Sequence, residues 1–262
     1  MDERRRHPVK TPVINLQNEN TDEVDIPQVF NTPVRHDVIR RAVIALQSTK
    51  FQPQGRDPMA GKRTTAESRG TGHGIARVPR LKGSNRAAFG VSIVGGHQAF
   101  PPLSEKDIVK RINKKEKRLA IRSGIAATAV KELVEKRGHK VQQVEQLPIV
   151  VSDELESLEK TRDVQDFLKA LKIWSDVERA DRRTVRAGKG KMRGRKHRKG
   201  KGPLIVIAED KGIKLAARNI PGVEVTELHT LNAEMLAPGA HPGRLIIWTQ
   251  SAIEQLDEVW MK

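Results

Sequence analysis

Two cationic segments hold the residues best suited to chemistry, and that chemistry is the binding of phosphate groups. In the first, residues 69–77 read Arg-Gly-Thr-Gly-His-Gly-Ile-Ala-Arg, so glycine stands at alternate positions between two arginines. Glycine adopts positive φ and lets a backbone approach a phosphate closely, while the flanking guanidinium groups neutralise its charge. A flexible, solvated loop is an equally good interpretation of these nine residues taken alone.

The second segment is the densest cationic run of the chain. Residues 181–203 hold eleven Lys and Arg against one acidic residue. These charges repel one another and the glycines disfavour a helix, so an isolated segment of this kind would be disordered. A solvated tail is the alternative, but the run lies between two hydrophobic segments. That position favours a loop that becomes ordered on RNA.

Motifs that would indicate an enzyme are weak. Residues 55–63 resemble a phosphate-binding loop, but the spacer is one residue too long and Arg63 stands where Ser or Thr would hold magnesium. The eight histidines show no metal-ligand spacing, and no Gly-x-Ser-x-Gly motif is present. Asp153, Glu154 and Glu156 are expected on an exposed acidic face. We therefore expect no catalytic residue, no metal and no cofactor.

Composition narrows the partner to a polyanion. The 262 residues include 49 Lys and Arg against 32 Asp and Glu, a net charge of +17, and no cysteine. Cysteine-based zinc sites, disulfides and thiol catalysis are thereby excluded. No apolar run approaches the roughly 20 residues that span a bilayer, and no leader is recognisable, so we expect an intracellular, cytoplasmic protein without a membrane partner. Nucleic acid is the natural counterpart.

The charge and the aromatic residues indicate how such binding would work. The positive charge is concentrated in residues 51–122 and 181–203, and the remainder of the chain is close to neutral. Only three aromatic residues, Phe51, Phe89 and Phe100, fall in the first of these two basic regions. Single-strand binders stack bases on several aromatic rings. We therefore expect phosphate contacts with already folded RNA.

The elements that must position these residues form an α/β pattern. Helices are predicted at 34–47, from Ser104 to about Gly138, at 161–171, 173–183, 211–218 and 231–236, and from Ser251. Strands are predicted at 147–151, 204–208, 223–228 and 245–248, whereas residues 11–16 and 24–30 are interrupted by proline and predict an edge strand or loops. Residues 51–102 follow no period and hold nine of the twenty glycines.

The predicted fold class is α/β, with a mainly parallel sheet of about four strands and helices on both faces, in a Rossmann-like three-layer arrangement. Residues 1–50 and 103–262 would form the globular domain. Residues 51–102 would be an extended RNA-penetrating arm inserted into it, and residues 181–203 a basic RNA-binding loop within it. So long a structureless stretch is expected only for a functional arm or a disordered segment.

Several stretches together resemble the universal large-subunit ribosomal protein four family, in its archaeal and eukaryotic branch. They are residues 62–63 and 69–77, the run Gly-Gly-His-Gln-Ala-Phe-Pro-Pro at 95–102, and residues 109–116, 118–123 and 200–204. The resemblance implies a structural constituent of the large ribosomal subunit that binds large-subunit RNA, aids its assembly and contacts neighbouring ribosomal proteins. It also implies that the arm tip, residues 69–77, lines the exit tunnel and meets the nascent peptide. His73 departs from the bacterial pattern, which often has a basic residue there.

The resemblance and the charge pattern together predict the RNA-binding residues. In the arm they are Arg56, Lys62, Arg63, Arg69, Gly70, Thr71, Gly72, His73, Gly74, Arg77, Arg80, Lys82, Arg86, Gly95 and Gly96; in the helix that follows, Lys110, Arg111, Lys114, Lys115 and Arg118; in the basic loop, Arg186, Lys189, Lys191, Arg193, Arg195, Lys196, Arg198 and Lys199.

Two other functions compete with this one. A nucleic-acid-acting enzyme with a Rossmann-like core would need a phosphate loop or a carboxylate cluster at the carboxyl ends of its strands. Residues 152–154 and 209–210 are the candidates for such a cluster. A chromatin or general RNA-packaging protein would bind duplex DNA as tightly as ribosomal RNA.

Overall fold

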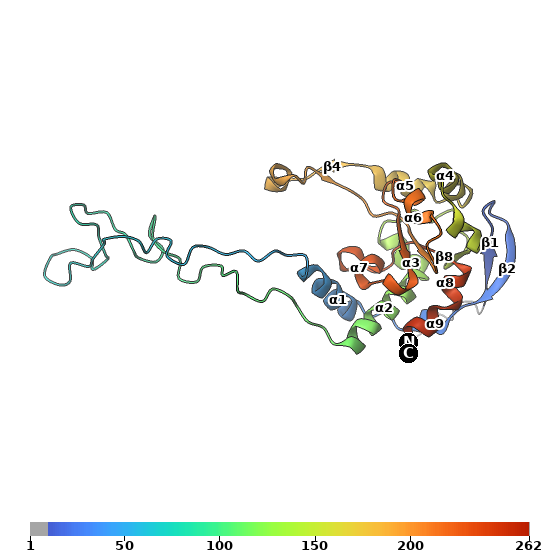
Figure 1. Cartoon of the computed structure of the whole chain (residues 1–262), viewed down its shortest axis with the longest axis horizontal. Coiled ribbons are helices and arrows are strands. Elements are labelled where there is room, and N and C mark those ends of the chain that lie inside the picture. Colours follow the sequence, from blue (N-terminus) through green and yellow to red (C-terminus); the bar gives the residue numbers. More distant parts are fainter. Residues whose placement is uncertain (1–9, 262) are drawn as a thin grey trace. The chain divides into compact units, whose positions relative to one another are not determined.

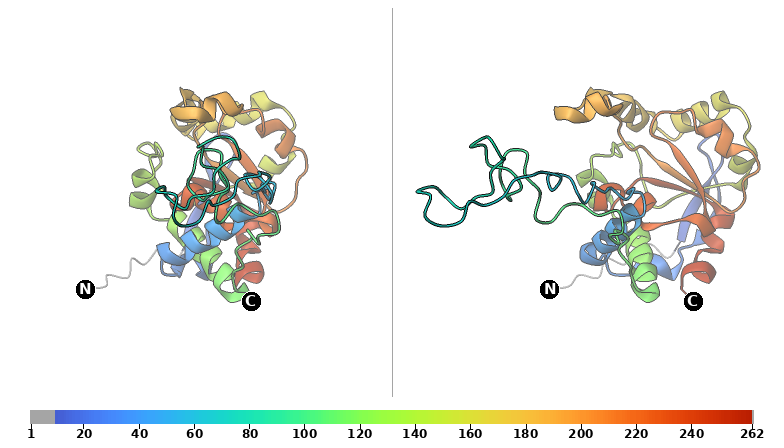
Figure 2. Two further views of the ribbon diagram at one scale, coloured as in Figure 1. Left: turned by 90° about the vertical axis from the view of Figure 1, so that its left-hand side faces the viewer. Right: turned by 60° about the vertical axis from the view of Figure 1, so that its left-hand side comes forward.

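The computed structural model describes residues 10–261. The chain divides into two compact units. One, here called the α/β unit, comprises the segments up to Gln47 and from Lys110 onward, and the other, the irregular unit, is Ser48–Val109. Residues 49–109 are all described and contain no helix or strand, and Figure 2 draws them as a continuous tube in teal and green. Isolated bridges such as Glu67–Arg80 and Arg80–Ala87 replace regular structure there.

A six-stranded sheet forms the centre of the α/β unit (Figure 1). Its strands are β1 (Lys10–Ile14), β2 (Asn20–Asp25), β3 (Ile149–Val151), β6 (Leu204–Ile207), β7 (Glu224–Glu227) and β8 (Ile246–Thr249), in the spatial order β2-β1-β3-β8-β6-β7. Only β2 is antiparallel to its neighbour, so the sheet is mainly parallel as predicted.

The first strand is the main difference from the predicted sheet of about four strands. β1 joins the parallel set through Val13 and Ile14, which pair with Val150 and Val151. Pro12, which lacks an N–H donor, precedes this pairing and faces β2 alone. The proline therefore marks where parallel pairing begins and does not exclude the strand from the sheet.

Helices surround the sheet. They are α1 (His36–Ser48), α2 (Lys114–Thr128), α3 (Lys131–Lys136), α4 (Thr161–Ala170), α5 (Trp174–Asp181), α6 (Ile213–Ala217), α7 (Ala233–Leu236), α8 (Gln250–Glu254) and α9 (Leu256–Trp260). The long helix predicted from Ser104 to about Gly138 begins only at Lys114 and is interrupted once, whereas its predicted stop agrees with the end of α3 at Lys136. Asp107 accepts a hydrogen bond from the N–H of Val109 in a local turn, and extended backbone at Val130 separates α2 from α3.

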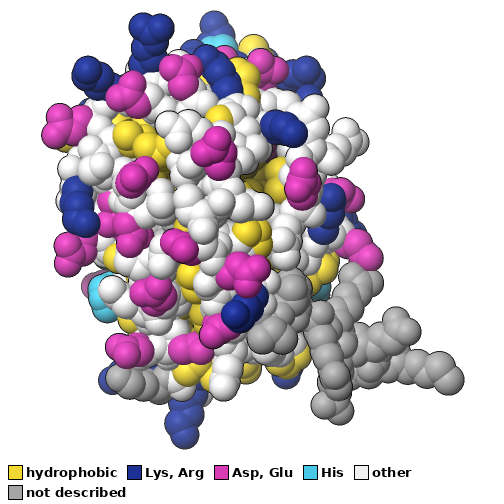
Figure 3. All heavy atoms as spheres, turned by 90° about the vertical axis from the view of Figure 1, so that its right-hand side faces the viewer, with side chains coloured by type: hydrophobic (Ala, Val, Ile, Leu, Met, Phe, Trp, Pro, Cys, Tyr) yellow, Lys and Arg dark blue, Asp and Glu magenta, His cyan; other side chains and the backbone are white. Residues whose placement is uncertain are grey.

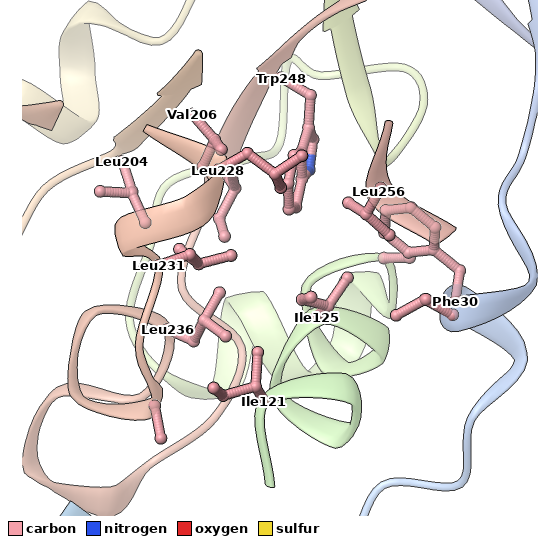
Figure 4. Close-up of a cluster of buried hydrophobic side chains, with 14 of the residues drawn as sticks. Phe30, Ile121, Ile125, Leu204, Val206, Leu228, Leu231, Leu236, Trp248 and Leu256 are labelled. Carbon is pink, nitrogen blue, oxygen red and sulfur yellow. The ribbon is translucent and has the colours of Figure 1, made fainter. Parts of the chain in front are cut away.

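Both faces of the sheet are buried, which explains why its central strands are continuously apolar. Leu204 and Val206 of β6 belong to a cluster with α1, α2, α7, α8 and α9, whereas Ile205 and Ile207 belong to a cluster with α4, α5 and α6. Successive side chains of a strand point to opposite faces, so each face receives every second residue. Figure 4 shows the first cluster, with Trp248 of β8 above Ile125 of α2.

Trp248 is the largest fully buried side chain of this core, and its ring meets that of Phe30 edge-on at 5.9 Å between centroids. Trp248→Ala is expected to lower the free energy of unfolding by roughly 3–5 kcal/mol, because it removes buried area and leaves a cavity. Urea unfolding followed by circular dichroism measures the loss. The control is Leu215→Ala on α6, where the side chain is 69% exposed. An equal loss in both variants would contradict this account of the core.

Candidate RNA interface

The alternating-glycine motif forms the end of a loop in the irregular unit. Two backbone hydrogen bonds between Glu67 and Arg80, each 3.1 Å, close this tip loop, residues 68–79. Every residue from Arg69 to Arg77 is exposed. Gly70, Gly72 and Gly74 adopt φ of 74°, 86° and 65°. The prediction of positive φ is therefore confirmed, and a side chain at these positions would be strained by the backbone conformation alone.

Two backbone segments approach one another closely elsewhere in the irregular unit, at Gly61 and Gly96. A Cβ atom added at Gly61 would lie 2.5 Å from the carbonyl carbon of Gly96, and one added at Gly96 would overlap the Gly90 carbonyl oxygen. Gly96 was predicted to bind RNA, but its lack of a side chain serves contact between two segments of this chain. Gly95 is different, because it is exposed with φ of 80°.

Only some of the predicted cations in the irregular unit have protein partners. Arg63 forms an ion pair with Asp57, Lys82 lies 3.7 Å from Glu67, and Arg56 donates to the Gln98 side chain. Arg80 donates to the Asn85 carbonyl. Lys62, Arg69, Arg77 and Arg86 are exposed. With two acidic residues against eight basic ones in residues 51–100, most of this positive charge is not neutralised within the unit.

Further cations gather at the start of α2. Lys110 and Arg111 precede the helix, Lys114 and Lys115 lie in its first turn and Arg118 follows, all of them exposed. Positive charge is unfavourable at a helix N-terminus, because the helix dipole is already positive there. A bound anion would relieve this repulsion.

The basic loop has more regular structure than the sequence indicated. Thr184–Val185 (β4) pairs antiparallel with His197–Arg198 (β5), and a 3₁₀ turn over Gly188–Arg193 connects the two. We call residues 184–198 the basic hairpin. Its predicted RNA-binding residues, Arg186, Lys189, Lys191, Arg193, Arg195, Lys196 and Arg198, are exposed, as is Lys199 just beyond it.

Two buried ionic clusters hold the base of this hairpin. In the first, the buried Asp176 accepts hydrogen bonds from His139 at 2.9 Å and from Arg179 at 2.8 Å, and Arg179 also donates to the Lys201 carbonyl at 2.7 Å. In the second, the fully buried Arg244 donates to the Gly202 carbonyl at 3.0 Å and pairs with Glu224 at 2.7 Å. Sequence reasoning missed these residues, because nothing local marks a buried Arg or His.

Charge within the α/β unit is segregated. Figure 3 shows the side that carries β1, β2 and α8, where acidic side chains are spread among fewer basic ones. β2 alone exposes Asp22, Glu23 and Asp25. A phosphate backbone is repelled from such a face.

The carboxylates at the carboxyl ends of the strands serve the fold. Glu156 was predicted to be exposed, which is wrong: it is 1% exposed and accepts hydrogen bonds from the Ala208 N–H and the Thr249 hydroxyl. Asp153 accepts from the backbone and the hydroxyl of Ser251. Asp210 accepts from the N–H groups of Gly212 and Lys214. These bonds join loops to helix starts, and they give no support to the enzyme alternative.

Residues 10–261 hold neither a cluster of metal-binding side chains nor a membrane-spanning helix. No group of three His, Asp or Glu side chains in that range is placed to hold a metal ion. No helix within it combines the length and hydropathy of a membrane span.

Comparison with known proteins decides the family. Residues 24–259 match the family described as the ribosomal protein L4/L1 family. The chain belongs to this family. It is 54% identical to a protein of Methanopyrus kandleri over 256 residues, which cover 95% of this chain and 98% of that one. A protein of Methanosphaera stadtmanae is 52% identical over 254 residues, covering 97% and 98%. For Archaeoglobus fulgidus the identity is 48%, covering 97% and 100%.

All three relatives are named large ribosomal subunit protein uL4. The resemblance identified from residues 62–123 and 200–204 is therefore confirmed, including its archaeal branch. Membership in the L4/L1 family also agrees with the absence of a recognisable catalytic motif in the sequence.

The cluster beneath the basic hairpin predicts how stability depends on pH. Burial raises the pKa of Asp176, but the hydrogen bonds from His139 and Arg179 outweigh this and hold it at about 2, below the usual 3.8. Burial lowers the pKa of His139 below 6.5. For both groups the unfolded chain binds protons more readily, so acidification favours unfolding.

Asp176→Asn is expected to lower the free energy of unfolding at pH 7 by roughly 2 kcal/mol, because the contribution of an ionised Asp176 is then lost. The difference from wild type should shrink as the pH falls from about 4 towards 2, where the wild-type carboxylate itself becomes protonated. Urea titrations at a series of pH values measure it. Asp181→Asn, an exposed carboxylate at the end of the same helix, is the control. A difference that stays constant with pH would refute the role given to Asp176.

Proposed function

We propose that the chain is a structural, non-catalytic constituent of the large ribosomal subunit that binds large-subunit RNA. The observation that carries this is the concentration of exposed cations on the irregular unit, the start of α2 and the basic hairpin, where basic residues far outnumber acidic ones. The names of the relatives support the assignment to the large subunit. The expected compartment is the cytoplasm, where such subunits act.

The irregular unit would be the arm, corresponding to predicted residues 51–102, and would enter folded RNA. Its ordering has little apolar burial to support it, while each fixed residue costs roughly 1–2 kcal/mol of backbone entropy. Phosphate contacts and the accompanying release of counterions would compensate. The α/β unit, a three-layer Rossmann-like arrangement with the basic hairpin at one side, would be the globular domain.

The tip loop would line the nascent-peptide exit tunnel. Gly70, Gly72 and Gly74 turn its exposed backbone at small cross-section, because they carry no side chain, and this suits a narrow passage. Arg69 and Arg77 flank it and would neutralise phosphates on either side. Neighbouring ribosomal proteins would contact the α/β unit on or beside its acidic face, the side that carries β1, β2 and α8.

Removal of cations should reduce the salt dependence of RNA binding. Two double variants test this: Arg193→Gln/Arg195→Gln in the hairpin and Arg69→Gln/Arg77→Gln in the tip loop. In each, the plot of log K against log salt should become shallower by about 1.5 to 2, because each phosphate contact contributes close to one to the steepness of its slope. Filter binding to large-subunit RNA at four salt concentrations measures it.

The matched control removes the same charge elsewhere, at the exposed Lys136 and Arg162 (Lys136→Gln/Arg162→Gln). Its slope should change little. A fall as large as that of the other two variants would mean that net charge alone attracts RNA.

The two units should also be separable. A variant in which a short linker replaces residues 64–90 keeps the Gly61–Gly96 approach and every residue of the α/β unit. We expect an unchanged urea midpoint but impaired incorporation into large subunits, measured by co-sedimentation through a high-salt gradient. Loss of cooperative unfolding would contradict the proposed division into domain and arm.

A further inference from the structure

A groove in the irregular unit has aromatic walls that phosphate binding does not require. It lies between residues 51–54 and residues 98–108, and Phe51, Phe100, Leu103 and Ile108 are its apolar lining. The Phe100 side chain is 92% exposed and that of Phe51 is 65% exposed. Two open phenyl rings on one groove stand out in a segment with so little apolar content.

The groove is fixed by contacts between the two segments that form it. The N–H of Arg56 donates to the Pro102 carbonyl at 3.1 Å, and its guanidinium donates to Oε1 of Gln98 at 3.3 Å. Pro101 and Pro102 restrict the chain immediately after Phe100. Phe100 is therefore presented from a tethered segment, which reduces the entropy lost when a ligand is bound.

The polar lining indicates what kind of ligand the rings would meet. Gln52, Gln54 and Gln98 line the groove, together with Lys106 and Glu105. A glutamine amide offers a donor and an acceptor side by side, the pattern found on the edge of a nucleobase. Arg56 holds the amide oxygen of Gln98 and leaves its NH₂ group as the donor. Lys106 supplies positive charge for a phosphate.

Phe100 and Gln98 have a second open side. Both also line a neighbouring hollow formed with Arg56, Gly96 and His97. A flat ring with space beside it, bordered by amides and cations, suits a flat, hydrogen-bonding, anionic ligand. An apolar peptide would leave the glutamines and the positive charge without partners.

We propose that this groove binds one unstacked nucleotide of large-subunit RNA. The base stacks on the Phe100 ring, with Phe51 as the second wall, the Gln98 amide on its edge and Lys106 near its phosphate. This rests on the proposed function, because it assumes that the arm lies in RNA. It adds a base-specific anchor to an interface otherwise made of phosphate contacts.

Chemical probing of the RNA tests the proposal. Full-length wild type and Phe100→Ala are bound to large-subunit RNA, which is then modified with dimethyl sulfate and carbodiimide, reagents that attack unpaired base edges. We expect one nucleotide, or two adjacent ones, to be protected by wild type and reactive with Phe100→Ala. The affinity should fall about tenfold, within the range for loss of one stacked base, with an unchanged salt slope.

Three further variants sharpen the result. Phe100→Trp keeps a stacking surface and should restore protection, whereas Phe100→Leu keeps apolar bulk without the flat ring and should not. Val94→Ala, an 85% exposed apolar side chain outside the groove lining, should leave protection intact. Full protection of the same nucleotide by Phe100→Leu would show that no flat ring is needed there and would overturn the proposed stacking.

The outcome separates this inference from the proposed function. If wild type binds the RNA with the expected dependence on Arg69, Arg77 and the basic hairpin, but its protections are identical to those of Phe100→Ala, only the nucleotide site is refuted. If wild type binds large-subunit RNA no more tightly than the Lys136→Gln/Arg162→Gln variant binds an unrelated RNA, the proposed function itself is refuted.

Discussion

Repulsion among cations that the chain does not neutralise for itself is the constraint on which the rest of the structure depends. The irregular unit carries eight Lys and Arg against two acidic residues in residues 51–100, and its apolar side chains, such as Val94 and Phe100, remain exposed. It can be held by isolated bridges and glycine turns, but burial contributes little to its order. A polyanion supplies the missing stabilisation, and this is why we assign the function through charge.

The α/β unit is under the opposite constraint. It must stay folded by itself although the start of α2 and the basic hairpin carry exposed positive charge. Its sheet is buried on both faces, with Trp248 on one side and Ile205 on the other. Asp176 and Arg244 then fasten the chain segments that enter and leave the basic hairpin. Burying such charges is costly unless each is paired and hydrogen-bonded. Asp176 is paired with Arg179 and Arg244 with Glu224, although Nη2 of Arg244 is buried without a hydrogen-bond partner.

Phosphate contacts and base contacts have different roles in this picture. Arginines at the tip loop and in the hairpin would give affinity and register on folded RNA without reading its sequence. The groove around Phe100 would place one base and thereby fix where the arm stops along its path. A segment with little core of its own is positioned by the RNA in this way, while Gly61 and Gly96 allow two of its chain segments to lie close together.

The sequence by itself determined the fold class, the segregation of charge, the positive φ of the tip glycines and the family, because periodicity, composition and short motifs are local properties. Tertiary structure alone decided that β1 enters the sheet beyond Pro12, that α2 begins at Lys114, and that Glu156 is buried. The first and the last of these depend on partners distant in the chain: β3 for Val13, and Ala208 and Thr249 at the ends of β6 and β8 for Glu156. The groove at Phe100 likewise exists only where two separate segments meet.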